Sequence, residues 1–301
     1  MNVLKEVITI LKRPQKIIRI LGYKNVFNWL PDEPYLKLIY WSEMGSALHL
    51  DNPQTYNEKL QWIKLYDRRS EYSTYVDKYA VRSYIREAIG EEYLIPILGV
   101  YNSVEEIDWD KLPNQFVLKC THGSSSNIIC TSKSKLDIEL SKKKLNKWMK
   151  KSWYWFGREW AYKDVKPRII CEKFLETKNN KPPADYKIMC FNGEPRLVQV
   201  HNDRFDSTYT TDFYDMNWRK TSITQGAPKS RGNIPKPQRF KEMVEISRKL
   251  SQKMLYARID FYEHNSQLYF GEITLYPTSG FKPFENKEFD FELGEWIKLP
   301  N

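Results

Sequence analysis

RIDFYEHNSQLYFGEIT, residues 258–274, consists of two apolar, aromatic-rich runs that flank a short polar centre. Such runs predict two β-strands joined as a hairpin. Residues two apart along a strand share a face, so Arg258 and Asp260 point together, as do Glu272 and Thr274. If the two strands pair, the carboxylates of Asp260 and Glu272 converge on one face of a sheet.

The converging side chains have the chemistry of a magnesium site. Two carboxylates and the hydroxyl of Thr274 are hard oxygen ligands, and Mg²⁺ bound in this way usually keeps waters and bridges substrate phosphates. Arg258 beside them can neutralise charge on a phosphoryl group during transfer. An ordinary salt-bridged hairpin is the alternative. Acids that face inward on apolar strands are uncommon without a cation, so the pattern favours the metal.

A second segment, FVLKCTHGSSS at residues 116–126, is a short β-rich run followed by a small polar loop. A lysine on a buried strand, here Lys119, needs an anionic partner. The small loop at 123–126 can bring backbone N–H groups close to phosphate oxygens. The segment fits equally well a surface hairpin whose lysine faces solvent.

A third segment, IICEKFLE at residues 169–176, is an apolar strand that ends in charged residues. Such a strand can line an adenine pocket. Backbone groups at Lys173 and Leu175 would read the base edge, and Glu172 would accept from its amino group. The alternative is a solvated cluster of charges at a strand end.

The rest of the chain indicates an α+β protein built from hairpins. The sequence predicts helices at 36–44, 58–65, 78–89, 136–155 and 240–255, and strands at 100–102, 116–120, 128–131, 168–174, 186–191, 196–201, 256–262 and 267–273. Thr55 and Glu58 form a capping-box pattern, and Gly90 suits a left-handed helix C-cap. Asn192-Gly193 is a strong hairpin signal.

Other patterns exclude common nucleotide-binding folds. The 225–237 segment is rich in Gly, Pro and Lys and predicts a long loop. The chain has neither GxGxxG nor GxxxxGK[ST], so a Rossmann or P-loop site is not supported.

Composition is that of a soluble globular protein. The chain has 301 residues, 41% hydrophobic and 29% charged, with a net charge of +10. Nucleic acid, an anionic membrane surface and a polyanionic small substrate all fit this charge. Nucleic acid is disfavoured because the sequence lacks zinc-finger, RNP and helix-turn-helix patterns. The lysines at 142–151 are expected to solvate a helix face.

The cysteines and the N-terminus suggest a cytoplasmic protein. Cys120, Cys130, Cys171 and Cys190 lie in apolar runs without CxxC spacing, which predicts free buried thiols. No apolar run approaches the roughly 18 residues of a membrane span, and the first 22 residues lack the apolar core of a signal peptide. This basic, amphipathic N-terminus could lie on the inner face of a membrane, although packing against the protein body is favoured.

Several segments, taken together and in order, resemble the ATP-grasp superfamily. The closer resemblance is to its TupA-like branch, which is associated with teichuronopeptide and surface-polysaccharide biosynthesis. The segments that carry the resemblance are NPQTYNEKLQWIKLYDR (52–68), VDKYAVRSYI (76–85), EEYLIPILGVY (91–101), LPNQFVLKCTHGSS (112–125), DYKIMCFNGEP (185–195) and RIDFY…LYFGEITLYPTSG (258–280). They cover most of the chain beyond residue 30.

The resemblance implies two α+β lobes that sandwich ATP, with an N-terminal helical extension at 1–75 and an ATP-grasp domain at 76–301. The nucleotide lobe would lie at about 112–170 and the metal-binding lobe at about 171–301. Implied nucleotide-binding residues are Lys119, Gly123, Ser124, Ser125, Ser126, Glu172, Lys173, Leu175 and Asp185. Arg258 and Lys187 would act on the reacting groups, and Asp260, Glu272 and Thr274 would hold Mg²⁺.

The family's chemistry implies a ligase that joins a carboxylate to an amine at the expense of ATP. The expected partners are an acidic sugar or polysaccharide precursor and an amino acid. Two departures stand out, because the superfamily's third metal ligand is usually Asn where this chain has Thr274, and a further glycine is expected where it has Ser125. A glycosyltransferase that uses a sugar nucleotide and a non-catalytic nucleotide-binding protein are the alternatives.

Overall fold

The computed structural model describes residues 14–175, 183–202 and 209–300. The helices are α2 (Lys16–Tyr23), α3 (Asp32–Met44), α4 (Tyr56–Tyr66), α5 (Glu71–Val76), α6 (Val81–Ala88), α7 (Ile138–Met149), α8 (Tyr154–Gly157), α9 (Phe240–Ser251) and α10 (Glu288–Trp296). The strands are β1 (Ile97–Tyr101), β2 (Phe116–Cys120), β3 (Asn127–Cys130), β4 (Ile169–Lys173), β5 (Asp185–Phe191), β6 (Glu194–Asn202), β7 (Thr210–Tyr214), β8 (Tyr256–His264) and β9 (Gln267–Thr274).

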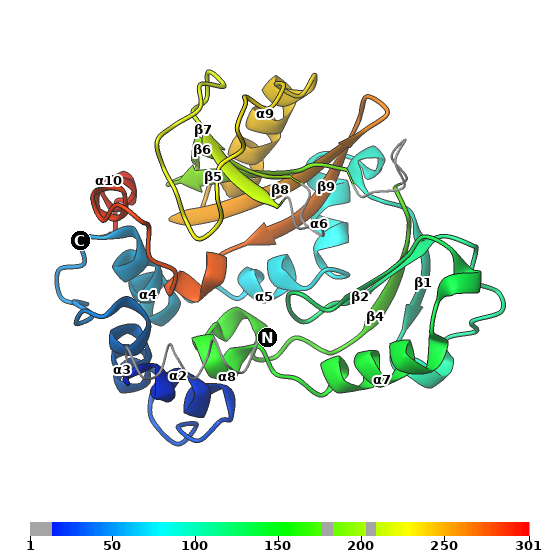
Figure 1. Cartoon of the computed structure of the whole chain (residues 1–301), viewed down its shortest axis with the longest axis horizontal. Coiled ribbons are helices and arrows are strands. Elements are labelled where there is room, and N and C mark those ends of the chain that lie inside the picture. The colour runs from blue at the N-terminus through cyan, green and yellow to red at the C-terminus, as the bar shows by residue number, and fades with distance from the viewer. Residues whose placement is uncertain (1–13, 176–182, 203–208, 301) are drawn as a thin grey trace.

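The strands form two antiparallel sheets. The smaller sheet has the order β1-β4-β2-β3 and the larger has the order β7-β6-β5-β8-β9. Figure 1 shows the larger sheet above and the smaller sheet at the lower right, with α5 and α6 between them. The α+β class and the predicted hairpins are therefore confirmed.

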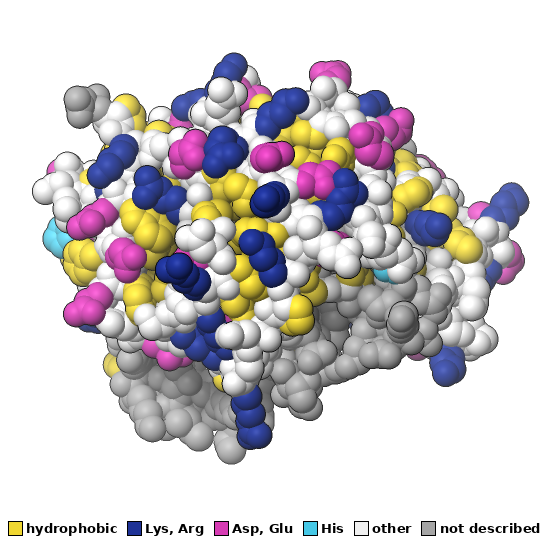
Figure 2. All heavy atoms as spheres, turned by 90° about the horizontal axis from the view of Figure 1, so that it is seen from above, with side chains coloured by type: hydrophobic (Ala, Val, Ile, Leu, Met, Phe, Trp, Pro, Cys, Tyr) yellow, Lys and Arg dark blue, Asp and Glu magenta, His cyan; other side chains and the backbone are white. Residues whose placement is uncertain are grey.

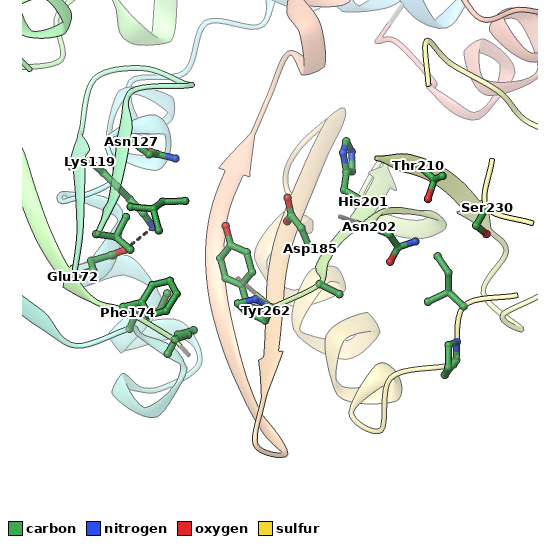
Figure 3. Close-up of a pocket in the computed structure, with 18 of the residues that line it drawn as sticks. Lys119, Asn127, Glu172, Phe174, Asp185, His201, Asn202, Thr210, Ser230 and Tyr262 are labelled. Carbon is green, nitrogen blue, oxygen red and sulfur yellow. Dashed lines mark ion pairs between the residues drawn. The ribbon is translucent and has the colours of Figure 1, made fainter. Parts of the chain in front are cut away.

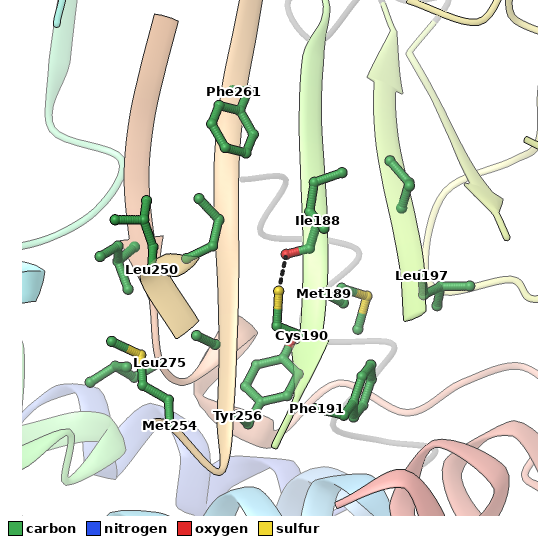
Figure 4. Close-up of a cluster of buried hydrophobic side chains, with 14 of the residues drawn as sticks. Ile188, Met189, Cys190, Phe191, Leu197, Leu250, Met254, Tyr256, Phe261 and Leu275 are labelled. Atoms are coloured by element: carbon green, nitrogen blue, oxygen red, sulfur yellow. Dashed lines mark hydrogen bonds between the residues drawn. The ribbon is translucent and has the colours of Figure 1, made fainter. Parts of the chain in front are cut away.

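One face of the larger sheet is apolar and is covered by α9. Ile188 and Cys190 of β5, Ile259 of β8 and Leu250 of α9 are at most 1% exposed. Figure 4 shows this cluster, in which the Cys190 thiol lies 3.9 Å from the Ile188 carbonyl oxygen. Because strand side chains alternate between faces, the residues between these apolar positions point to the opposite face, where the polar groups described below gather.

The hairpin between β5 and β6 follows its turn chemistry. Asn192 and Gly193 have φ values of 48° and 84°, as a type I′ turn requires at both central positions. The capping box at α4 is also present, since the Thr55 hydroxyl accepts from the Glu58 N–H and the Glu58 carboxylate accepts from the Thr55 N–H.

The N-terminal helices pack against one another and against the C-terminal helix α10. α2 lies against α3, and α4 contacts α10 (Figure 1). Arg158, just after α8, is 1% exposed and donates to the Leu30 carbonyl at 3.0 Å. Its guanidinium also lies over the ring of Tyr35 at 4.2 Å. The boundary predicted at residue 75 falls in the last turn of α5, and the division into domains stays a prediction.

Some element predictions are wrong in detail. The single helix predicted at 136–155 is two helices, α7 and α8, because residues 150–153 leave the helical path. Gly90 has a positive φ of 116° but an extended ψ of 157°, so it is not a left-handed C-cap. β7 and α10 were not predicted.

The surface carries both signs of charge. On the face above the larger sheet, Figure 2 shows Lys and Arg side chains interspersed with Asp and Glu around exposed apolar groups. The net charge is therefore not gathered into one basic patch on this face. Within the described ranges, no helix has the length and apolar character that a membrane crossing requires. Residues 1–13, which carry most of the predicted membrane contact, lie outside the described residues.

Candidate active site

The polar face of the larger sheet carries a row of charged side chains across three strands. Lys187 of β5 is paired with Asp260 of β8, and Asp260 is paired with Glu272 of β9. Arg258 and Thr274 form the neighbouring pair in the same hairpin. The predicted convergence of Asp260 and Glu272 is thus the observed register.

A β-bulge helps to set this register. The pairing shifts between Asp260 and Phe261, which leaves Gly271 as the extra residue on β9. A Cβ atom at Gly271 would lie 3.0 Å from the Asp260 carbonyl oxygen. A glycine therefore permits the close approach at the bulge that directs Glu272 toward Asp260.

Arg258 is the centre of the hydrogen bonds in the row. It donates to both carboxylate oxygens of Asp260, at 2.6 and 2.7 Å, and to the Thr274 hydroxyl at 3.0 Å. Glu272 lies 3.4 Å from the same guanidinium. Such a bidentate pair fixes the orientation of both partners.

Lys187 is buried on the same face and connects two acids. Its ammonium lies 2.8 Å from the Asp185 carboxylate and also contacts Asp260. Asp185 is the first residue of β5, so the Lys187 side chain links Asp260 to the start of that strand.

Lys78 completes the cluster from outside the sheet. It lies just before α6, donates to the Gly123 carbonyl at 2.6 Å and pairs with Glu272 at 3.1 Å. Burial alone would raise the pKa of Glu272, but the charges of Lys78, Lys187 and Arg258 hold it well below its usual range. Sequence reasoning missed Lys78, although it stands in the VDK tripeptide of a segment that carries the resemblance.

The charges of the cluster balance, because three acids face three bases. The acids are Asp185, Asp260 and Glu272, and the bases are Lys78, Lys187 and Arg258. A bare Mg²⁺ would add two uncompensated positive charges. Among the described residues, no group of three or more Asp, Glu, His or Cys side chains is placed to hold a metal ion alone. The oxygens of Asp260, Glu272 and Thr274 are those that could contact a Mg²⁺ ion arriving with phosphate oxygens and water, and Asp260 would then share its oxygens between the ion and Arg258.

A cavity of about 630 Å³ lies between the two sheets. The residues that line it include the predicted nucleotide-binding residues Lys119, Glu172, Lys173, Leu175 and Asp185. Figure 3 shows Lys119, Glu172 and Phe174 on one wall, and Tyr262 and Asp185 opposite them. The structure thus brings five residues from three separate segments to one cavity.

Glu172 is held by two cations. Its carboxylate pairs with Lys119 at 2.5 Å and with Arg82 of α6 at 3.4 Å. Both Lys119 and Glu172 face the cavity, so the anionic partner expected for the strand lysine is Glu172. Arg82 is a second residue that sequence reasoning missed, because α6 reaches β4 only through tertiary packing.

At the end of β4, one backbone N–H group is already hydrogen-bonded within the protein. The Lys173 N–H donates to the Pro96 carbonyl at 3.0 Å, so this donor is not free for a base. The loop predicted at 225–237 contributes the far wall of the cavity through residues 230–235. Lys220 fixes this loop by donating to the carbonyls of Ser230 and Gly232 at 2.8 and 3.0 Å.

The predicted phosphate loop, residues 123–126, does not line this cavity. Gly123 lies beneath Trp153, whose indole nitrogen would be 1.6 Å from a Cβ atom at that position. Ser124 and Ser125 are exposed, whereas Ser126 is buried. Ser125 has a φ of 58°, which is the left-handed conformation that glycine adopts most readily.

Two facing antiparallel sheets, with charged residues on the inner face of one and a cavity between them, are what the ATP-grasp resemblance predicts. A family model described as TupA-like ATP-grasp matches residues 58–298. The chain belongs to the TupA-like ATP-grasp family. A search of curated proteins found no match.

The solved structures that resemble the chain are distant. A D-alanine–D-alanine ligase from Bacillus anthracis complexed with ATP is 16% identical over 67% of this chain and 55% of its own, with a TM-score of 0.40. The corresponding Helicobacter pylori enzyme is 16% identical over 81% and 69%, with a TM-score of 0.43. An L-amino acid ligase from Bacillus licheniformis is 12% identical over 74% and 49%, with a TM-score of 0.40. The chain thus spans 55% of the first of these structures and 49% of the last.

Proposed function

We propose that the protein is an ATP- and Mg²⁺-dependent ligase that joins a carboxylate to an amine. The observation that carries this proposal is the row of Lys187, Asp260 and Glu272 across three strands, with Arg258 bonded to both acids. Family membership supports the same chemistry. The nucleotide would lie in the cavity between the sheets, with its base at the Lys173 carbonyl and Leu175 and its phosphates toward Lys119.

Each residue of the row has a proposed role in phosphoryl transfer. Asp260, Glu272 and Thr274 would hold Mg²⁺, which neutralises the phosphate oxygens when bound. Arg258 would neutralise charge on the reacting phosphoryl group, and Lys187 would orient it. Lys78, which pairs with Glu272 at 3.1 Å, would pair with a phosphate oxygen when the nucleotide is bound. The 123–126 loop would close over the phosphates.

The reaction has two steps. An oxygen of the substrate carboxylate attacks the γ-phosphorus of ATP, the bond to the β-phosphate oxygen breaks, and an acyl phosphate and ADP result. The amine nitrogen then attacks the acyl carbon, phosphate leaves, and the nitrogen loses a proton. Repulsion between the carboxylate and the triphosphate is the barrier that the cations reduce.

The acid is proposed to be a uronic acid or a similar acidic sugar of a surface polysaccharide, and the amine an amino acid. The net charge of +10 is consistent with an acidic precursor. The protein would act in the cytoplasm, where ATP and such precursors are available.

Ligand-induced thermal stabilisation tests the nucleotide assignment. ATP with Mg²⁺ should raise the melting temperature, Mg²⁺ alone should not, and UDP-glucose and GDP-mannose should have no effect. Stabilisation by sugar nucleotides but not by ATP would favour a glycosyltransferase and contradict the proposal.

Two substitutions test the metal assignment. Asp260→Asn and Glu272→Gln should each abolish Mg²⁺-dependent release of ADP in the presence of glucuronate and glutamate. The control is Asp290→Asn, which changes a buried acid on α10 that lies outside the charged row and bonds Asn57. If both site variants keep their activity, the metal assignment is wrong. ATP binding without ADP release from the wild type under any mixture of acid and amine substrates would indicate a non-catalytic nucleotide-binding protein.

A further inference from the structure

A second cavity, which we call the α6 groove, lies beside the nucleotide cavity and has a separate lining. Its volume is about 1110 Å³, against about 630 Å³ for the nucleotide cavity. One wall is a face of α6 formed by Arg82, Ser83 and Arg86, which neighbour one another on the helix. Tyr79, in the turn just before α6, extends this wall. Gln267 and Tyr269 of β9 also line it.

A thin partition separates the two cavities. Leu94 and Pro96 line the α6 groove, whereas Ile95 between them lines the nucleotide cavity. This alternation is that of an extended segment, whose successive side chains point to opposite sides. Arg82 reaches through the partition, because it lines the groove while bonding the Ile95 carbonyl at 2.8 Å and Glu172 at 3.4 Å. The groove is therefore a separate compartment.

Three guanidinium groups give the groove its chemistry. Arg82, Arg86 and Arg168 line it, and each has one acidic partner that leaves other N–H donors unused. The Nε–H of Arg168 is buried and has no hydrogen-bond acceptor within the described chain. Planar guanidinium groups bind carboxylates in a bidentate manner.

The remaining lining suits hydroxyl groups and ring faces. Glu91, Glu92 and Gln267 offer acceptors for hydroxyl hydrogens, although the two acids also oppose a carboxylate placed beside them. Tyr79 lies under the Arg168 guanidinium at 4.6 Å, and Tyr269 supplies a second aromatic ring. A ligand that matches all of these groups carries both carboxylates and hydroxyls.

We propose that the α6 groove binds an acidic saccharide whose carboxylates pair with Arg86 and Arg168. The groove would hold the glycan beside the nucleotide compartment, with Arg82 between the two. The proposal rests on the proposed function only for the class of sugar, and binding can be measured without turnover.

Isothermal titration of the full chain tests the proposal at moderate salt, so that non-specific charge effects are screened. The probe is trigalacturonate, with neutral maltotriose and the hydroxyl-free triglutamate peptide as comparisons. Trigalacturonate should bind, and the other two should bind at least about tenfold more weakly, the change that one charge-assisted hydrogen bond produces. Equal binding of maltotriose or triglutamate would overturn the assignment.

A matched pair of variants locates the binding site. Arg86 and Arg248 are both 48% exposed, both lie on helices and both form surface ion pairs at 3.0 Å. Arg86→Gln should weaken trigalacturonate binding about tenfold or more, and Arg248→Gln should leave it unchanged. An equal effect of both would show that only net charge matters and would overturn the groove assignment.

A non-hydrolysable ATP analogue with Mg²⁺ separates this proposal from the proposed function. Increasing concentrations of the analogue should change the dissociation constant of trigalacturonate only up to a limit, since the compartments are distinct and can only be coupled. A dissociation constant that keeps rising in proportion to the analogue concentration would put the saccharide in the nucleotide cavity and overturn the proposal. If no ADP forms with any substrate, the ligase assignment fails while the titration still decides the groove.

Discussion

At the scale of single residues, the two exposed serines of the 123–126 loop differ in backbone conformation. Ser125 has a φ of 58°, whereas Ser124 does not have a positive φ. A left-handed conformation costs a residue with a Cβ atom roughly 1–2 kcal/mol. Ser125→Gly should therefore raise the free energy of unfolding by about 1 kcal/mol, as measured by urea denaturation. Ser124→Gly, the matched control, should lower it by up to about 1 kcal/mol. If both variants lose stability, the positive φ of Ser125 does not strain the backbone.

The four cysteines give a prediction that depends on pH. All four are free and buried, as the sequence predicts. Burial raises the pKa of Cys171 and Cys190 to about 12 and that of Cys120 to about 11. A thiol reagent near neutral pH should label none of them in the folded protein and all of them in denaturant, since the thiolate is the reactive form.

The same thiols affect stability at high pH. Their folded-state pKa values exceed the ordinary thiol value of about 8.5, so the unfolded state loses these protons first. Their contribution to stability should fall as the pH rises from about 8.5 toward those values. Chemical denaturation across this range, compared with Cys190→Ala, would measure the contribution of one thiol. If the difference in unfolding free energy between the wild type and Cys190→Ala does not change with pH, the predicted contribution of the thiol is wrong.

The candidate site was predictable where it depends on strand geometry. The two-residue period places Arg258 with Asp260 and Glu272 with Thr274, and a hairpin brings the pairs together. Lys78 and Arg82 were not predictable in this way. Lys78 approaches Glu272 from the turn before α6, and Arg82 approaches Glu172 from α6 itself. Both acids are distant in the sequence, and no local pattern encodes that packing.

At the scale of elements, local signals predicted those that carry their own caps and turns. The Thr55 capping box and the Asn192-Gly193 turn are examples. The predicted helix at 136–155 is broken where Trp153 packs over Gly123, and that tertiary contact overrides local preference. β7 is a short edge strand that begins with two threonines, so it lacks the apolar run by which the other strands were recognised.

The capping box gives a prediction at this scale. Thr55→Ala removes the hydroxyl that accepts from the Glu58 N–H at 3.2 Å. The variant should lose about 1 kcal/mol of unfolding free energy, the usual contribution of an N-cap. Thr55→Ser keeps the acceptor and should lose less. Equal losses measured by urea denaturation would indicate that the methyl group matters rather than the hydrogen bond.

At the scale of the whole molecule, one buried arginine joins the N-terminal helices to the rest of the chain. Arg158 donates to the Leu30 carbonyl, and its guanidinium lies over the rings of Tyr35, at 4.2 Å, and Trp155, at 4.9 Å. It has a φ of 49°, so the backbone there is held in the left-handed region. The planar cation therefore adds to the other contacts across this junction, which include the Tyr35 hydroxyl donating to the Phe156 carbonyl at 3.0 Å and the Tyr154 hydroxyl donating to Asp32 at 2.5 Å.

Replacing this residue should destabilise the junction. Arg158→Lys keeps the charge but loses the planar group, and should lower the unfolding free energy by more than about 2 kcal/mol. Arg196→Lys, an arginine over the ring of Trp296 at 5.7 Å, is the control and should change it by less than about 0.5 kcal/mol. Limited proteolysis should then cut the variant faster before α4. Equal stability of Arg158→Lys and the wild type would show that charge alone suffices.

Arg82 spans the partition between the two compartments, since it bonds the Ile95 carbonyl while pairing with Glu172. A ligand that draws this guanidinium to one side removes a counter-charge from the other. Thermodynamic reciprocity then requires each ligand to alter the dissociation constant of the other by the same factor. The effect of one ligand on the dissociation constant of the other can therefore be measured by titrating either of the two ligands.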